Sequence, residues 1–93
     1  MTRVLLPSSG FLRASQRLLR KKLWAAQDLH ATLQLLAEDA FHPQLRTHKL
    51  RGKLAGSWAC SVDYDVRVVF DFINRGDAEA ILLITVGTHE EVY

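Results

Sequence analysis

Two segments of the chain carry residue types that could take part in acid/base or phosphate chemistry. Residues 48–58 read HKLRGKLAGSW and combine one histidine, three Lys/Arg side chains and two glycines. Cations attract a phosphate backbone, and glycines allow a main chain to approach it closely. Composition leaves two interpretations of this segment open: a phosphate-binding loop and an ordinary solvated loop.

The second segment, residues 87–93, reads GTHEEVY and follows the apolar run 80–86. A histidine just beyond a strand, here His89, suits proton transfer because imidazole titrates near neutral pH. The alternative interpretation is a surface histidine on a frayed terminus.

Other kinds of site find no support in the sequence. The four histidines are scattered, no Cys/His pair has zinc-finger spacing, and no glycine-rich phosphate loop is present. We therefore expect no metal and no cofactor. Cys60 is the only cysteine, so it has no partner for an internal disulfide, and we expect it to be a buried strand thiol rather than a nucleophile. His30 and His42 are expected to be surface or capping groups.

Composition and charge bound the class of protein. The chain has 93 residues, 48% of them hydrophobic and 24% charged, which is typical of one globular domain over residues 1–93. No apolar run approaches the roughly 18 residues of a membrane span, and the first apolar stretch is too short for a secretory signal. We therefore expect a cytoplasmic protein with no membrane association.

The charges are divided unevenly along the chain. Residues 1–53 hold ten Lys/Arg and three Asp/Glu, a net charge of +7, whereas residues 54–93 hold two Lys/Arg and seven Asp/Glu, a net charge of −5. A basic half suggests a surface that faces a polyanion, although two solvated basic helix faces would give the same totals.

The elements that would position these residues can be read from periodicity. Residues 3–6 predict a short strand, and Ser8 or Ser9 is a good N-cap for a helix whose apolar residues recur at helical spacing over 11–23. A second helix is predicted over about 25–39 and ends before His42-Pro43. Trp24, at the corner between the helices, is expected to be a packing residue.

From residue 57 onward the period becomes two. Trp58, Cys60 and Val62 should face one way, and two further strands are predicted over 66–73 and 80–86, separated by turns. Residues 46–56 predict a loop or a short strand. The sequence thus predicts an α+β domain in which two helices cover one face of a four-stranded, mostly antiparallel sheet, leaving the other face free for a substrate or partner.

Three blocks of residues resemble a known family. They read HKLxGxLxGxW over 48–58, YDxRVVF over 64–70 and GTHxEVY over 87–93. In this order and spacing they resemble the RelE/ParE superfamily of toxins from type II toxin–antitoxin systems, and specifically its YafQ-like mRNA interferase branch. The match is tight over 46–93 and loose over 1–45.

This resemblance implies a RelE-like βααβββ fold and an endoribonuclease that cuts mRNA, usually in the ribosomal A site, and so inhibits translation. It also implies a cognate antitoxin that wraps and blocks the toxin, with operator DNA bound only indirectly through the antitoxin complex. Cleavage would proceed by attack of a 2′-hydroxyl on the adjacent phosphorus, without a metal.

The resemblance also assigns roles to individual residues. His89 is expected to be the general acid, and His48 or Asp65 the general base or a residue that orients its partner. Arg67 would stabilise the charged phosphorane with its planar guanidinium, and Tyr93 would stack on a base or bind a phosphate. Three cations of the basic segment would bind the RNA backbone: Lys49, Arg51 and Lys53.

One departure from the family pattern concerns the base. YafQ-like toxins commonly carry a further histidine on the strand before the Tyr64-Asp65 turn, and Ser61 stands at that position here. Two alternatives follow from the same family: a ParE-like, non-catalytic gyrase inhibitor, which His89 disfavours, and an inactive homologue that binds only its antitoxin and operator DNA, which Ser61 would explain.

Overall fold

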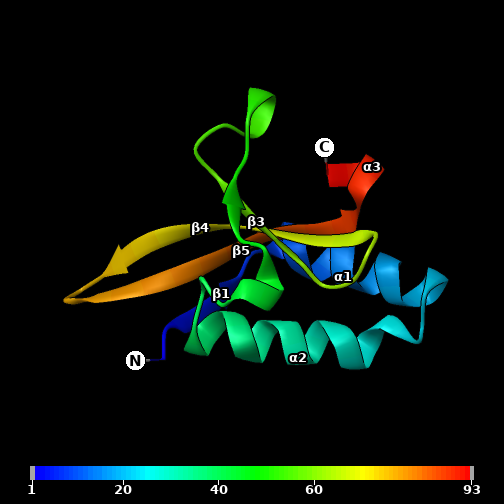
Figure 1. Cartoon of the computed structure of the whole chain (residues 1–93), viewed down its shortest axis with the longest axis horizontal. Helices are drawn as coiled ribbons and strands as arrows, with labels where there is room; N and C mark the ends of the chain where they lie inside the picture. The colour runs from blue at the N-terminus through cyan, green and yellow to red at the C-terminus, as the bar shows by residue number, and fades with distance from the viewer. Residues whose placement is uncertain (1, 93) are drawn as a thin grey trace.

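The computed structural model describes residues 2–92 of the chain (Figure 1). Its main elements follow in chain order: β1 (Val4–Pro7), α1 (Ser9–Lys21), α2 (Ala25–Glu38), β2 (His48–Lys49), β3 (Trp58–Ser61), β4 (Val66–Arg75), β5 (Ala78–Thr88) and α3 (His89–Val92). Two short 3-10 turns, η1 (Pro43–Leu45) and η2 (Gly52–Leu54), flank β2. The predicted α+β class and the order of the first helices and strands are confirmed.

The sheet has five strands in the order β1-β5-β4-β3-β2, rather than the four we predicted. The additional strand is β2, in which His48 pairs with Ala59 and Lys49 pairs with Trp58. β1 runs parallel to β5, and the remaining neighbours are antiparallel. The basic segment therefore begins as the edge strand of the sheet and not as a free loop.

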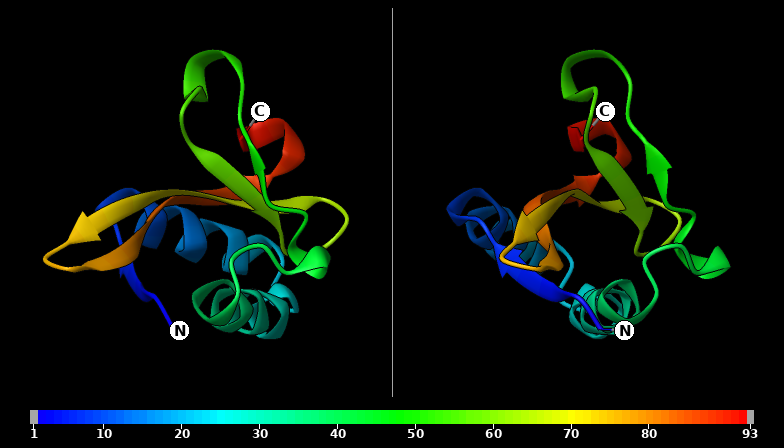
Figure 2. Two further views of the ribbon diagram at one scale, coloured as in Figure 1. Left: turned by 60° about the vertical axis from the view of Figure 1, so that its left-hand side comes forward. Right: turned by 90° about the vertical axis from the view of Figure 1, so that its left-hand side faces the viewer.

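α1 and α2 lie on one face of the sheet, as both views of Figure 2 show. Ser8 fixes where α1 begins, because its hydroxyl oxygen accepts the Phe11 N–H at 3.0 Å. The same hydroxyl donates to the Ile84 carbonyl at 3.1 Å, which ties the start of α1 to β5. The predicted N-cap is confirmed, and Ser8 fixes both the start of α1 and its position against the sheet.

The main hydrophobic core lies between this face and the two helices. Val66, Val68 and Phe70 contribute from β4, and α1 contributes Phe11 and Leu18. Trp58, Cys60 and Val62 also face this core, as the period-two pattern predicted. Within residues 2–92 no helix is long and apolar enough to cross a membrane.

The opposite face of the sheet is partly covered, and our expectation that it would be free is wrong. A second, smaller core forms there from Leu50, Ala59, Val69 and Val92. Leu50 follows β2 and Val92 lies in α3, so the β2–β3 connection and α3 both close over this face (Figure 2). We refer to it as the α3 face.

Trp24 also differs from its predicted role. It was predicted to pack at the helix corner, but 63% of its surface is exposed. The Lys22 ammonium lies 5.5 Å from the centre of its ring. The apolar corner is instead closed by the fully buried Ala25, so the large indole is left outside the core.

Candidate active site

The short helix α3 is held by a reciprocal pair of hydrogen bonds. The Thr88 N–H donates to Glu91 Oε1 at 2.9 Å, and the Glu91 N–H donates to Thr88 Oγ1 at 3.4 Å. This is a capping box, in which a threonine and a glutamate three residues later satisfy each other's backbone donors. Hydrogen bonds with the Thr88 backbone and side chain hold the pKa of Glu91 below its ordinary value. This helix was not predicted from the sequence, although the Thr-x-x-Glu spacing was a signal for it.

Gly87 allows α3 to fold back against the end of β5. A Cβ atom at this position would lie 3.1 Å from Glu91 Oε1 and 3.3 Å from Glu91 Cβ, so a larger residue would require the Glu91 side chain to shift by a few tenths of an ångström. The turn makes His89 the first residue of α3. Its N–H donates to the Asp65 carbonyl at 2.7 Å, which anchors the histidine backbone to the turn between β3 and β4.

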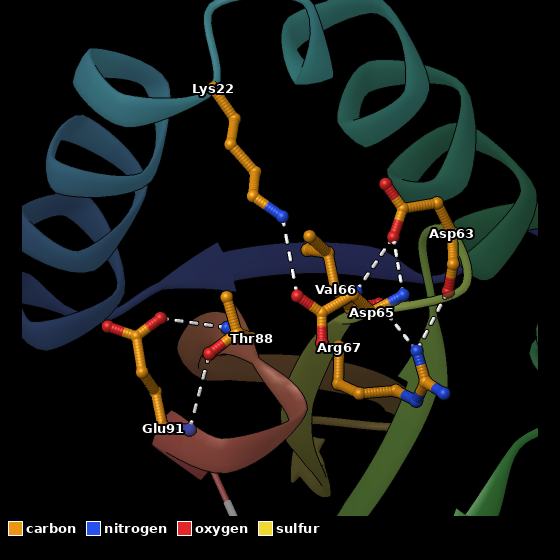
Figure 3. A network of polar contacts seen from close by, with 7 residues as sticks. All are labelled: Lys22, Asp63, Asp65, Val66, Arg67, Thr88 and Glu91. Atoms are coloured by element: carbon orange, nitrogen blue, oxygen red, sulfur yellow. Dashed lines mark hydrogen bonds and ion pairs between the residues drawn. The ribbon is translucent and has the colours of Figure 1, made fainter.

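That turn is itself rigidly built. Asp63 Oδ1 accepts the N–H groups of Asp65 and Val66, each at 2.8 Å, as in an Asx turn. The Asp65 carboxylate then pairs with the Lys22 ammonium at 3.3 Å (Figure 3). Asp65 thus joins three parts of the chain: its own turn, the corner after α1 and, through its carbonyl, the start of α3.

Arg67 lies at the start of β4, next to this turn. Its Nη1 donates to the Asp63 carbonyl at 2.8 Å and to the Val66 carbonyl at 3.1 Å, so one edge of the guanidinium is fixed by main-chain acceptors (Figure 3). A guanidinium has five donors, and Nη1 supplies only two of them. The group is therefore oriented while it keeps donors for a ligand.

Asp65, Arg67 and His89 line a single hollow of about 590 Å³. Tyr64, Thr88 and Glu90 complete its lining. Its size falls in the range of ligand sites in proteins. We call it the His89 hollow. The structure therefore brings together three of the residues that the sequence singled out, although they come from a turn, a strand and a helix.

His48 lies two strands away but on the same face of the sheet. It is paired with Ala59, which is paired with Val69, and both of these belong to the small core of the α3 face. Arg67 precedes Val69 by two residues and so shares this face. His48 is exposed and lies outside the lining of the His89 hollow.

The tautomer of neutral His48 can be inferred from its neighbour. Its Nδ1 lies 2.8 Å from the Arg46 carbonyl oxygen. Because a carbonyl oxygen only accepts, Nδ1 must carry the proton, and Nε2 of the neutral ring is then an acceptor. This is the form that a general base requires.

The three predicted RNA-binding cations are separated by the structure. Arg51 and Lys53 line a second hollow of about 640 Å³ against Glu91 and Val92 of α3. Lys49 follows His48 on β2 and so points to the opposite face, where its ammonium lies 5.4 Å from the centre of the Trp58 ring. Two cations therefore adjoin the α3 face, and Lys49 does not.

Ser61 lies directly opposite Arg67 in the register of β3 and β4. Both residues line a further hollow of about 370 Å³, together with Arg46 and Asp63. The neighbouring Cys60 is buried on the other face, and burial raises the pKa of its thiol to about 12, which agrees with a structural role. Tyr93 lies outside the described residues, so its predicted contact with RNA stays a prediction.

The two remaining histidines have ordinary surroundings. His30 is exposed on α2, and His42 Nδ1 accepts the Gln44 N–H at 3.1 Å, which caps η1. Both agree with the surface or capping roles expected for them. Within residues 2–92 no group of three His, Cys, Asp or Glu side chains is placed to hold a metal ion.

Lys22 is the site residue that sequence reasoning did not find. It is separated from Asp65 by 43 positions, and it sits in a basic run that reads as solvated helix surface. No local pattern marks such a pair. The only signal was the net positive charge of the first half of the chain.

Solved structures define the class of protein to which this fold belongs. YafQ from Escherichia coli strain BL21(DE3) superimposes with a TM-score of 0.79 over 98% of both chains, at 15% sequence identity. The YoeB/ParE toxin from Agrobacterium tumefaciens gives a TM-score of 0.74 at 15% identity, over 92% of this chain and 98% of that one. The chain therefore has the fold of these two toxins, which is the fold that the three sequence blocks implied.

Sequence comparison places the chain more narrowly. A family profile described as "Bacterial toxin of type II toxin-antitoxin system, YafQ" matches residues 4–93. The chain belongs to this family of type II toxins. No individually curated protein matches the sequence significantly.

Proposed function

We propose that this toxin is an endoribonuclease that cuts mRNA at the His89 hollow. The observation that carries the proposal is that His89, Arg67 and Asp65, which come from a helix, a strand and a turn, line one hollow. In the proposed step the 2′-oxygen of a nucleotide forms a bond to the adjacent phosphorus, and the bond to the 5′-oxygen breaks. The products are a 2′,3′-cyclic phosphate and a 5′-hydroxyl end.

His89 would donate the proton that the departing 5′-oxygen needs. Its backbone is fixed at the start of α3 by the 2.7 Å bond to the Asp65 carbonyl and by the capping box behind it. A positioned general acid accelerates such a step by about 10²–10⁴-fold. Rigid placement is what makes this gain available, because proton transfer requires the donor within hydrogen-bond distance of the leaving oxygen.

His48 would remove the proton of the 2′-hydroxyl. The Arg46 carbonyl selects the tautomer of neutral His48 in which Nε2 accepts. The other candidate, the Asp65 carboxylate, is already paired with the Lys22 ammonium. We therefore assign Asp65 to holding the turn and α3 in place. This division leaves no task for an imidazole at the position of Ser61.

Arg67 would bind the phosphorane. During the attack, negative charge accumulates on the oxygens around phosphorus, and a guanidinium held in advance stabilises that charge without reorganisation. Arg51 and Lys53, on the other side of α3, would attract the flanking RNA backbone.

The proposal extends to partners. The structure of the E. coli DinJ–YafQ toxin–antitoxin complex contains a toxin that superimposes on this chain with a TM-score of 0.77 at 16% identity, over 100% of this chain and 99% of that one. We infer a cognate antitoxin for this toxin, contact with operator DNA only through that antitoxin, and cleavage of cytoplasmic mRNA on the ribosome that inhibits translation.

The test compares two histidine substitutions after induced expression in cells. His89→Ala should reduce mRNA cleavage, measured by primer extension, by about a hundredfold or more. His30→Ala, a matched change at an exposed histidine of α2, should leave cleavage unchanged. The new 5′ ends should be hydroxyls, which a polynucleotide kinase labels without prior phosphatase treatment.

Equal cleavage by wild type and His89→Ala would remove His89 from the reaction. If neither the wild type nor His30→Ala cleaves RNA, the nuclease proposal itself fails. A supercoiling assay that shows inhibition of gyrase by the wild-type protein would then favour the ParE-like alternative.

A further inference from the structure

A basic groove adjoins the His89 hollow and has no part in the steps described above. It has a volume of about 540 Å³ and lies between α1 and the end of β5. Arg17, Lys21 and Lys22 line it from the side of α1, and Thr88 and Glu91 line it from the other side. We call it the α1 groove.

The charge of the groove is positive. Three cations face one carboxylate, that of Glu91, which already accepts the Thr88 N–H. Figure 3 shows the Glu91 carboxylate on the side of α3 that faces α1. After the Thr88 hydrogen bonds, the charges of Lys21 and Arg17 add to the lowering of the Glu91 pKa, so these cations act across the groove. An excess of positive charge beside a hollow attracts an anion.

The α1 groove and the His89 hollow lie side by side. Thr88 lines both of them. Lys22 lines the groove, and its ammonium bonds to the Asp65 carboxylate of the hollow at 3.3 Å. A polyanionic strand that has one phosphate beside Arg67 can therefore pass over Thr88 and reach Arg17 and Lys21.

An exposed aromatic side chain at the same corner indicates which polyanion fits. Trp24 is 63% exposed, and its ring lies beside Lys22. An unpaired base can stack on an exposed indole, whereas the carboxylates of an acidic peptide gain nothing from it. Cations beside an exposed aromatic surface are typical of single-stranded nucleic acid sites.

We propose that the α1 groove binds a phosphate of the RNA strand next to the one that is cut, through Arg17 and Lys21, with Trp24 receiving a flanking base. The proposal rests on the proposed function for the identity of the strand as RNA. It adds a second binding subsite, on the helix side of α3, to the hollow in which cleavage would occur.

The experiment measures binding without cleavage. The probe is a fluorescent 12-nucleotide single-stranded RNA with 2′-O-methyl groups throughout, which cannot be cut because no free 2′-hydroxyl is present. Its anisotropy is titrated with the full chain carrying His89→Ala. The test variant adds Arg17→Gln and Lys21→Gln. The control adds Arg13→Gln and Arg20→Gln, the same charge change at exposed positions of α1 outside the groove.

We expect the groove variant to bind about tenfold more weakly at 0.15 M salt, and its slope of log K against log salt to fall by about 0.7, as the loss of one phosphate contact requires. The control should change affinity by about twofold or less. A charge-keeping variant, Arg17→Lys with Lys21→Arg, should retain binding. RNA should also quench tryptophan fluorescence, and Trp24→Leu should abolish that quenching.

Equal effects of the two glutamine variants would overturn the proposal, as would the absence of measurable RNA binding. Binding of a hepta-glutamate peptide with the same dependence on Arg17 and Lys21, together with no RNA binding, would assign the groove to an acidic protein partner and would overturn it too. Because no cleavage occurs in this assay, a failure of the nuclease proposal would show in primer extension while the groove result stands separately.

Discussion

The two faces of the sheet differ in how they are held. The helix-covered face buries the large core, including the fully buried Phe70, Ile81 and Val66. Among residues 2–92, four are buried in the core of the α3 face, and the order of this face comes from hydrogen bonds of the capping box and the Asp63 turn. We infer that the helix-covered face supplies most of the free energy of unfolding. The α3 face holds the polar groups of the site in place and contributes little to that free energy.

The largest expected effect tests this division directly. Phe70→Ala should lower the free energy of unfolding by about 3–5 kcal/mol, because it opens a cavity in the main core. The free energy of unfolding of the whole chain should be roughly 5–14 kcal/mol. Val92→Ala, in the small core, should lower the free energy of unfolding by about 1–2 kcal/mol. It should nevertheless reduce cleavage at least about tenfold, because α3 loses its packing contact with the sheet.

Urea unfolding and primer extension on the same variants provide the measurement. Leu12→Ala, at a half-exposed position of α1, is the matched control and should change neither quantity appreciably. Full cleavage by the Val92→Ala protein would mean that the packing of α3 against the sheet is not needed to position His89. A loss of stability as large as that of Phe70→Ala would show that the two faces do not differ as we infer.

Sequence patterns predicted the helix-covered face well and the α3 face poorly. Long elements such as α1 and β4 carry enough residues for a period to be recognised. β2 has two residues and α3 has four, too few for any period. The separation of Lys49 from His48 follows from strand alternation once β2 exists, but the segment also reads as a loop.

The candidate site was predicted as a set of residue types rather than as an arrangement. His89, Arg67 and Asp65 were named from sequence blocks, and the structure gathers them around one hollow. The contacts that hold them are long-range or reciprocal, such as that of Lys22 with Asp65, and no single segment encodes these. The exposure of Trp24 could not be foreseen either, because a tryptophan at a helix corner is typical of a core.

An ion pair joins the two faces of the molecule. Lys22 comes from the corner after α1, and it pairs with Asp65 beside the hollow. Its side chain is 28% exposed and that of Asp65 is 46% exposed, so Lys22→Gln should cost less than about 1 kcal/mol of stability. Cleavage should fall by about three- to tenfold, because the turn that anchors His89 loses one of its ties.

A double-mutant cycle distinguishes this role from general charge loss. In an Asp65→Asn background, Lys22→Gln should cause no further fall in cleavage, because the partner is already gone. Lys22→Arg should preserve most of the activity, and Arg20→Gln on the same helix should leave it unchanged. Additive losses from Lys22→Gln and Asp65→Asn would show that the two side chains act separately.

The smallest expected effect is a pH dependence confined to the α3 face. The pKa of Glu91 is lowered in the folded chain, first by its hydrogen bonds to Thr88, so its carboxylate stabilises α3 fully above the unfolded value of about 4.3. This contribution is lost as pH falls through the lower folded pKa. The difference in urea midpoint between wild type and Glu91→Gln should therefore be constant above about pH 5 and shrink below pH 4. A difference that grows on acidification would mean that the protonated side chain holds α3 better, and that the capping box is not the device that positions His89.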